Sequence, residues 1–250
     1  MFYLLVFLFS LTFPDKVPPL EIFPDIECST ESSEIIPPLI STPDSTNIET
    51  VPDLFFECQI AELSRTTRIP LFYDETVRHY INLYFTERKN QIAPILAKSN
   101  EYFPIFQKHL EKSNLPHELK YLPILESALS ATAVSASEAV GLWQFKKETG
   151  IHYGLRIDQD IDERINPEAS TIAACKYLSE IYSRFGDWHI TLMAYQAGPG
   201  TIQRAIEASG GKTSYHDLYN FLPEQTQKYL PAYVAMIYIF TNYKNHCDCR

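Results

Sequence analysis

Glycine and alternating strand patterns are scarce in this chain. Only eight of its 250 residues are glycine. Beyond residue 60, no alternation of apolar and polar residues continues for more than a few positions, which argues against extended β-structure. Apolar residues recur there at helical spacing instead. The sequence therefore predicts a mainly α protein.

Basic residues are absent from residues 17–60, where no lysine or arginine occurs. The same segment contains nine acidic residues and seven prolines among serine and threonine. Such a composition cannot bury enough apolar surface to offset its ordering entropy, so we expect a disordered, extended acidic tether over 17–60. Ten of the 31 acidic residues and one of the 21 basic residues precede residue 61, which leaves the remainder close to neutral. This balance suggests neither nucleic acid nor an anionic membrane surface as a partner.

A long apolar run is also missing, because the apolar residues at the N-terminus end at residue 13. A membrane-spanning helix needs about 20 residues. The segment 1–16 is therefore expected to be a signal peptide or a short apolar anchor that attaches the protein to a membrane. No basic residue precedes the run and no small-residue cleavage site follows it, so both interpretations stay open. In either case we expect an exported protein of the periplasm or cell envelope.

Patterns typical of metal ligands are absent. The seven histidines form no His-Glu-x-x-His pair, and the five cysteines are odd in number and show no ligand spacing. We therefore expect no metal and no cofactor. Cys175 lies on the apolar side of a predicted helix and is expected to be a core thiol.

Apolar spacing and capping residues mark the helices of the main part of the chain. Gly186 offers a left-handed C-cap, Asp187 can cap the next helix, and that helix should end at Gly198. The predicted helices cover 75–96, 101–112, 170–185 and a last segment from Glu224 through Phe240.

One carboxylate stands out at the end of a leucine-rich segment. Leu115, Leu119, Leu122 and Leu125 share a helical face that leads to Glu126, with Asn114 as the expected N-cap and Pro123 as a kink. A carboxyl among apolar side chains loses hydration of its charged form, so its pKa rises and it can act as an acid near neutral pH. Spacing alone also fits a helix-end carboxylate in a structural ion pair.

Short motifs that follow in order decide between these interpretations. Together they resemble the soluble lytic transglycosylase catalytic domain of the goose-lysozyme-like superfamily, over roughly residues 65–240. The motifs are Glu126-Ser127, Gly141-Leu-Trp-Gln-Phe145, Thr149-Gly150, Asp162-Glu-Arg164, Ala173-Ala-Cys-Lys-Tyr-Leu178 and Ala194-Tyr-Gln-Ala-Gly198. The resemblance implies a lysozyme-like helical domain with a glycan groove at 113–242. A helical N-terminal extension at 61–112 would precede it, and a frayed C-terminus at 243–250 would follow it.

The resemblance also implies an activity on peptidoglycan glycan strands by a monomer. The β-1,4 bond between N-acetylmuramic acid and N-acetylglucosamine would be cleaved with formation of a 1,6-anhydro ring. Glu126 would be the single general acid and base, because the C6 hydroxyl of the substrate can serve as nucleophile. The substrate-binding residues would be Ser127, Gln144, Tyr195, Gln196 and Tyr229, with Trp143 and Gln225 as groove walls.

Three positions depart from the family pattern. Gln196 replaces the usual asparagine, Gln225 replaces a glutamate, and Glu138 stands where glycine is common. These departures leave open a catalytically impaired peptidoglycan-binding protein. The same fold with water as acceptor leaves open a second alternative, a hydrolytic lysozyme-type muramidase. Hydrolysis would call for a second carboxylate from the cluster at 158–162, whose arginine neighbours are more typical of a salt-bridged loop.

Overall fold

The computed structural model describes residues 51–247, with side chains through residue 243. The expected signal or anchor at 1–16, most of the expected tether, and the last three residues lie outside the described residues. Regular structure in the described part is helical, and its β-type contacts are isolated bridges. The mainly α prediction is confirmed.

The α-helices are α1 (Asp53–Thr66), α2 (Glu75–Phe85), α3 (Lys89–Lys112), α4 (Leu122–Ser127), α5 (Lys147–His152), α6 (Pro167–Phe185), α7 (Trp188–Ala197), α8 (Pro199–Ala208), α9 (Tyr215–Leu218) and α10 (Glu224–Cys247); the short 3-10 helices are η4 (His117–Tyr121), η5 (Glu163–Ile165) and η6 (Tyr219–Phe221).

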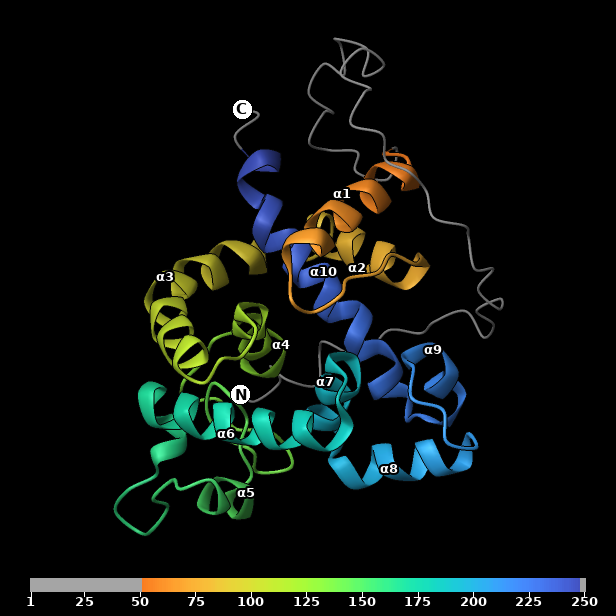
Figure 1. Ribbon diagram of the computed structural model, residues 1–250. Helices are drawn as coiled ribbons and strands as arrows, with labels where there is room; N and C mark the ends of the chain where they lie inside the picture. The colour runs from red at the N-terminus through yellow and green to blue at the C-terminus, as the bar shows by residue number, and fades with distance from the viewer. Residues whose placement is uncertain (1–50, 248–250) are drawn as a thin grey trace.

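The long helix α10 connects the parts of the molecule. It packs against α2 and α7, while α6 packs against α3 and α7. Figure 1 shows α10 rising past α2 and α1, with α6 crossing the lower part of the view beneath α3 and α4. Large aromatic side chains fill the space between these helices, and their burial is the main favourable contribution to folding. The largest fully buried ones are Trp143, Tyr229, Tyr233, Tyr238, Phe56 and Phe106.

The helix ends around α7 follow the predicted caps. Gly186 ends α6 with φ 70°, in the left-handed region. The Asp187 side chain accepts a hydrogen bond from the Ile190 amide and starts α7, which ends at Gly198. The last helix begins at Glu224, as expected.

Two predicted boundaries are wrong. The helix expected over 75–96 breaks after Phe85, where the Arg88 amide donates to the Leu83 carbonyl, and α3 then continues to Lys112. The tether expected to extend to residue 60 ends earlier, because α1 begins at Asp53. Phe56 and Ile60 on this helix are buried, and their burial offsets the entropy cost of ordering the segment.

The segment before Glu126 also differs from its prediction. Asn114 is not an N-cap: it has φ 53° after the end of α3, where a left-handed asparagine is common. Pro123 lies in the first turn of α4 and causes no kink, because no intrahelical partner exists there for its missing N–H. The C-terminus expected to fray from residue 243 is helical to Cys247.

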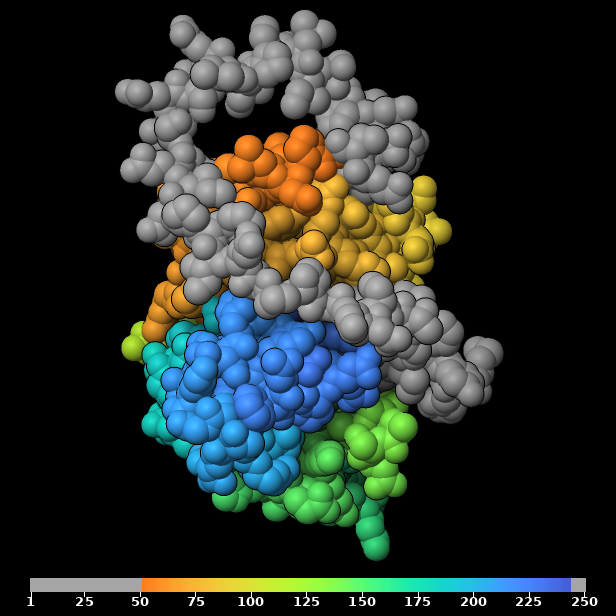
Figure 2. Space-filling model, turned by 90° about the vertical axis from the view of Figure 1, so that its right-hand side faces the viewer, coloured from red at the N-terminus to blue at the C-terminus, as the bar shows by residue number. Residues whose placement is uncertain are grey.

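The surface in Figure 2 places residues of α1 and α2 in the upper part of the view and the C-terminal helices in the lower part. The residues that follow α4 lie beside those C-terminal helices. Within residues 51–247, no helix combines the length and the apolarity needed to cross a membrane.

Candidate active site

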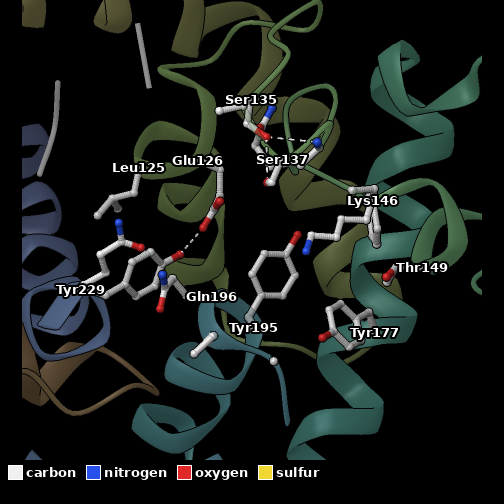
Figure 3. A pocket seen from close by; sticks show the side chains of 17 residues that line it. Leu125, Glu126, Ser135, Ser137, Lys146, Thr149, Tyr177, Tyr195, Gln196 and Tyr229 are labelled. Carbon is white, nitrogen blue, oxygen red and sulfur yellow. Dashed lines mark hydrogen bonds between the residues drawn. The ribbon is translucent and has the colours of Figure 1, made fainter. Parts of the chain in front are cut away.

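A groove of about 610 Å³ lies where α4 and the segment after it meet the middle of α6, the C-terminal end of α7 and the N-terminal end of α10. Figure 3 shows Glu126 on one side, Tyr195 in the middle, and Ser135 and Ser137 at one end. Of the predicted site residues, the groove brings together Glu126, Gln144, Tyr195, Gln196, Gln225 and Tyr229. Segments up to 103 residues apart in the sequence thus meet at one place.

Glu126 is held at the end of α4. The helix stops at Ala128, which has a left-handed backbone with φ 49°. The Tyr229 hydroxyl donates to Glu126 Oε1 at 2.5 Å. Burial raises the pKa of the Glu126 carboxyl to about 7, although the Tyr229 hydrogen bond lowers it. The group can therefore hold a proton near neutral pH and still be stabilised as a carboxylate after releasing it.

Tyr195 lies at the end of α7 and connects this helix to the Gly141–Phe145 motif. Its hydroxyl donates to the Trp143 carbonyl at 2.7 Å. Burial, and next the nearby Glu126, raise the Tyr195 pKa well above its ordinary value, so the phenol stays protonated. Its oxygen can accept a hydrogen bond from a ligand. Tyr177 packs against it with ring centroids 5.3 Å apart and continues the wall of the groove.

Gln144 has a left-handed backbone with φ 49°. Its Nε2 donates to the Gly141 carbonyl at 2.9 Å and to the Ala133 carbonyl at 3.3 Å. Its Oε1 is buried and has no hydrogen-bond partner among the described residues. An unpaired buried amide oxygen is costly, so a ligand hydroxyl or N–H donor would gain from pairing with it.

The two glutamines that depart from the family pattern lie on opposite sides of a helix contact. Gln196 at the end of α7 accepts a hydrogen bond from the Thr226 hydroxyl of α10 at 2.9 Å. Its Nε2 is left to donate toward the groove. Gln225 lines the groove and is exposed. Glu224 instead forms an ion pair with Lys228 and is not among the lining residues, so it does not replace the family glutamate.

Arg164 donates hydrogen bonds to the loop that carries Gln144 and holds it in place. The sequence alone did not indicate this structural role of Arg164. This buried side chain donates from Nη1 to the carbonyls of Glu138 (3.1 Å) and Phe145 (3.2 Å). Its ion pair with Asp162 measures 2.7 Å, and these Arg164 contacts hold the Asp162 pKa below its usual range. Asp162 therefore supplies a permanent counter-charge. Glu138 has φ 62°, which explains why glycine suits that position.

Two predicted site residues lie behind the groove. Trp143 is fully buried and donates from its indole nitrogen to the Thr171 hydroxyl at 3.0 Å, so it is a core residue and forms no wall. The buried Ser127 hydroxyl lies 3.0 Å from the carbonyls of both Pro123 and Leu142. Ser127 therefore connects the end of α4 to the loop and does not reach a ligand.

Some lining residues were not predicted. Thr149 and Tyr177 belong to the family motifs, and Lys146 directly follows the Gly141–Phe145 motif, so the sequence could have indicated that they line the groove. No sequence feature indicated Ser135 and Ser137 as lining residues. The acidic cluster at 158–162 contributes no side chain to the lining, and its Asp158 pairs with Arg156 at 2.6 Å as expected of a salt-bridged loop.

The helical fold and the groove with its one carboxyl of raised pKa define a class of helical domains that can present a single acid to a ligand. Comparison with known proteins narrows this class. Residues 103–218, slightly less than half of the chain, match the family described as Transglycosylase SLT domain.

Two curated relatives and one solved structure are similar to this chain. The chain is 32% identical over 164 residues to membrane-bound lytic murein transglycosylase D of Escherichia coli (strain K12), covering 65% of this chain and 36% of that protein. It is 33% identical over 106 residues to peptidoglycan transglycosylase gp16 of Escherichia phage T7, covering 41% of this chain and 8% of that protein. The fold resembles the 70 kDa soluble lytic transglycosylase of Escherichia coli with a TM-score of 0.50 and 23% identity, over 57% of this chain and 24% of that one. The chain thus spans about a third of the first relative's length.

Proposed function

We propose that this protein is a peptidoglycan lytic transglycosylase. It cleaves the β-1,4 bond between N-acetylmuramic acid and N-acetylglucosamine and leaves a 1,6-anhydro-N-acetylmuramic acid end. The observation that carries the proposal is the environment of Glu126: a carboxyl with a pKa of about 7, in a groove whose described lining includes no second carboxylate.

The reaction needs only this one acid. Protonated Glu126 donates its proton to the glycosidic oxygen as the bond from that oxygen to C1 breaks. The resulting carboxylate, stabilised by the Tyr229 hydroxyl, then accepts the proton of the C6 hydroxyl as its oxygen bonds to C1. The glutamate ends protonated again, and no water is consumed.

The polar side chains around Glu126 are suited to an N-acetylated sugar. The unpaired Oε1 of Gln144 can accept from an acetamido N–H or a sugar hydroxyl, and Gln196 Nε2 can donate to a carbonyl. Tyr195 and Tyr177 offer aromatic surface for sugar rings. All these groups come from one chain, so a monomer is sufficient.

The substrate also suggests where the protein works. Peptidoglycan lies in the cell envelope, and the E. coli relative is described as membrane-bound. We place this protein in the envelope, exported through its N-terminal apolar segment or attached by it to a membrane.

A hydrolytic muramidase on the same fold is the second candidate, and the reaction product distinguishes the two. We expect the full-length protein, incubated with purified peptidoglycan, to release anhydro-muropeptides in mass analysis. Glu126→Gln should abolish the release, while Glu148→Gln, which changes an exposed glutamate outside the groove, should leave it intact. Reducing-end products would show hydrolysis, and intact glycan bound by every variant would show a binding protein.

A further inference from the structure

The charged side chains that line the groove are Glu126 and Lys146. Figure 3 shows the Lys146 side chain directed toward the middle of the groove, from the side opposite Tyr229. The proposed reaction uses the glutamate and leaves the lysine without a role. An ammonium group at this place calls for an explanation.

The local structure does not supply one. Lys146 occupies the N-cap position of α5, but its side chain makes no capping hydrogen bond there. Its contribution to the helix comes from its backbone carbonyl, which accepts from the Gly150 amide at 2.8 Å. Among the described residues, no carboxylate forms an ion pair with its ammonium group. Another side chain could therefore replace it without loss of a local contact.

Tuning of the acid does not explain the lysine either. The causes of the Glu126 pKa shift are burial and the Tyr229 hydrogen bond, and Lys146 is not among them. The Tyr195 pKa is likewise set by burial and by groups other than Lys146. What remains is an interaction with the ligand.

We propose that Lys146 binds a carboxylate of the glycan strand and makes the protein prefer carboxylate-bearing strands over neutral ones. The inference rests on the proposed function, since the groove must hold peptidoglycan. Strands offer a carboxylate from two sources: the peptide stem attached to N-acetylmuramic acid, or the lactyl group itself once the stem has been removed. A lysine, with a flexible stem and a compact charge, suits a substituent of variable position.

Binding to three glycans tests the proposal in the full-length Glu126→Gln protein, which cannot turn over its ligand. The ligands are a neutral chito-oligosaccharide, a peptide-free strand with lactyl carboxylates, and a stem-bearing strand. Lys146→Gln is added to this background. Lys147→Gln serves as the matched control, because Lys147 is the neighbouring lysine, is exposed and does not line the groove.

We expect Lys146→Gln to raise the Kd of at least one carboxylate-bearing strand roughly fivefold, with less than twofold change for the chito-oligosaccharide. A loss confined to the stem-bearing strand identifies the stem carboxylate, and one confined to the peptide-free strand identifies the lactyl group. Lys147→Gln should change neither, Lys146→Arg should restore binding, and added salt should shrink the difference.

Two results would overturn the inference alone: equal losses on all three ligands, or binding that does not respond to Lys146→Gln. If the protein that retains Lys146 bound none of the glycans, the proposed function would fail together with it. Titration of the Glu126→Gln protein that retains Lys146 with the three glycans therefore tests the proposed function first, and the Lys146→Gln titrations then test the inference alone.

Discussion

The burial of the Glu126 carboxyl lowers the stability of the folded protein at neutral and alkaline pH. In the unfolded chain a glutamate titrates near 4.5, whereas burial raises the pKa in the folded protein to about 7. The folded state therefore binds more protons between these pH values, and stability falls as the pH rises through this window. The difference amounts to roughly 3 kcal/mol above pH 7. A site that keeps an acid protonated near neutrality thus works against folding in the same pH range.

Tyr229 counteracts part of this effect, and Tyr229→Phe tests its role. The hydroxyl favours the carboxylate, so its removal should raise the Glu126 pKa and move the alkaline limb of the kcat/KM profile to higher pH. The loss of a charge-assisted hydrogen bond should also lower the maximal rate by roughly tenfold or more. The measurement is the pH–rate profile on peptidoglycan.

Tyr238→Phe is the matched control for that experiment. Tyr238 lies on the same helix, α10, and its hydroxyl donates to Gln59 Oε1 at 3.1 Å, on the α1 side of the molecule. Its profile should match that of the unmodified protein. A Tyr229→Phe profile whose alkaline limb stays in place or moves to lower pH would contradict the assigned hydrogen bond.

At the scale of elements, the loop at 134–145 depends on a close backbone approach at Gly141. A Cβ added there would lie 2.0 Å from the Arg164 carbonyl oxygen, and its φ is 88°. We expect Gly141→Ala to cost about 3 kcal/mol or more, because backbone on both sides of the contact would have to shift. Gly186 has a similar left-handed backbone, with φ 70°, but a Cβ added there would have no atom within 4 Å. Gly186→Ala therefore tests the backbone strain without the close contact, and it should cost about 1 kcal/mol. Urea denaturation measures the free energy of unfolding of both variants. Equal losses would show that the backbone around Arg164 can shift at little cost to accommodate the added Cβ.

Elements whose ends are set by neighbours in the sequence were predictable. Gly186, Asp187 and Gly198 act within one turn of their own helices, so their roles could be inferred from residue type. The structure around the end of α4 could not be predicted in this way, because it depends on contacts between distant segments. The Ser127 hydroxyl donates to the Leu142 carbonyl, and Arg164 donates to the Phe145 carbonyl of the same loop. For the same reason Trp143 was misplaced: its partner Thr171 lies on α6. Glu126 was predictable because it directly follows a segment whose regularly spaced leucines are buried in the core.

At the scale of the whole molecule, α10 joins the groove to the N-terminal helix. Tyr229 at one end of this helix contacts Glu126, and Tyr238 further along it packs against Phe56 of α1 with ring centroids 5.6 Å apart. The family match covers residues 103–218 and includes neither α1 nor α10. The folded unit is therefore larger than the region defined by the family, and a shortened chain limited to that region would lose Tyr229 from the groove.

The neighbouring phenylalanines of α1 test how firmly this helix belongs to the fold. Phe56 is fully buried, and the Arg78 guanidinium lies 4.2 Å from its ring centroid, whereas Phe55 is 38% exposed. We expect Phe56→Ala to lower the free energy of unfolding by about 3 to 4 kcal/mol and Phe55→Ala by about 1 kcal/mol or less. Chemical denaturation of the full-length variants measures both. Equal small losses would show that α1 contributes little to the core. A large loss at Phe56 alone would make this helix part of the scaffold that holds α10, and with it Tyr229, against the groove.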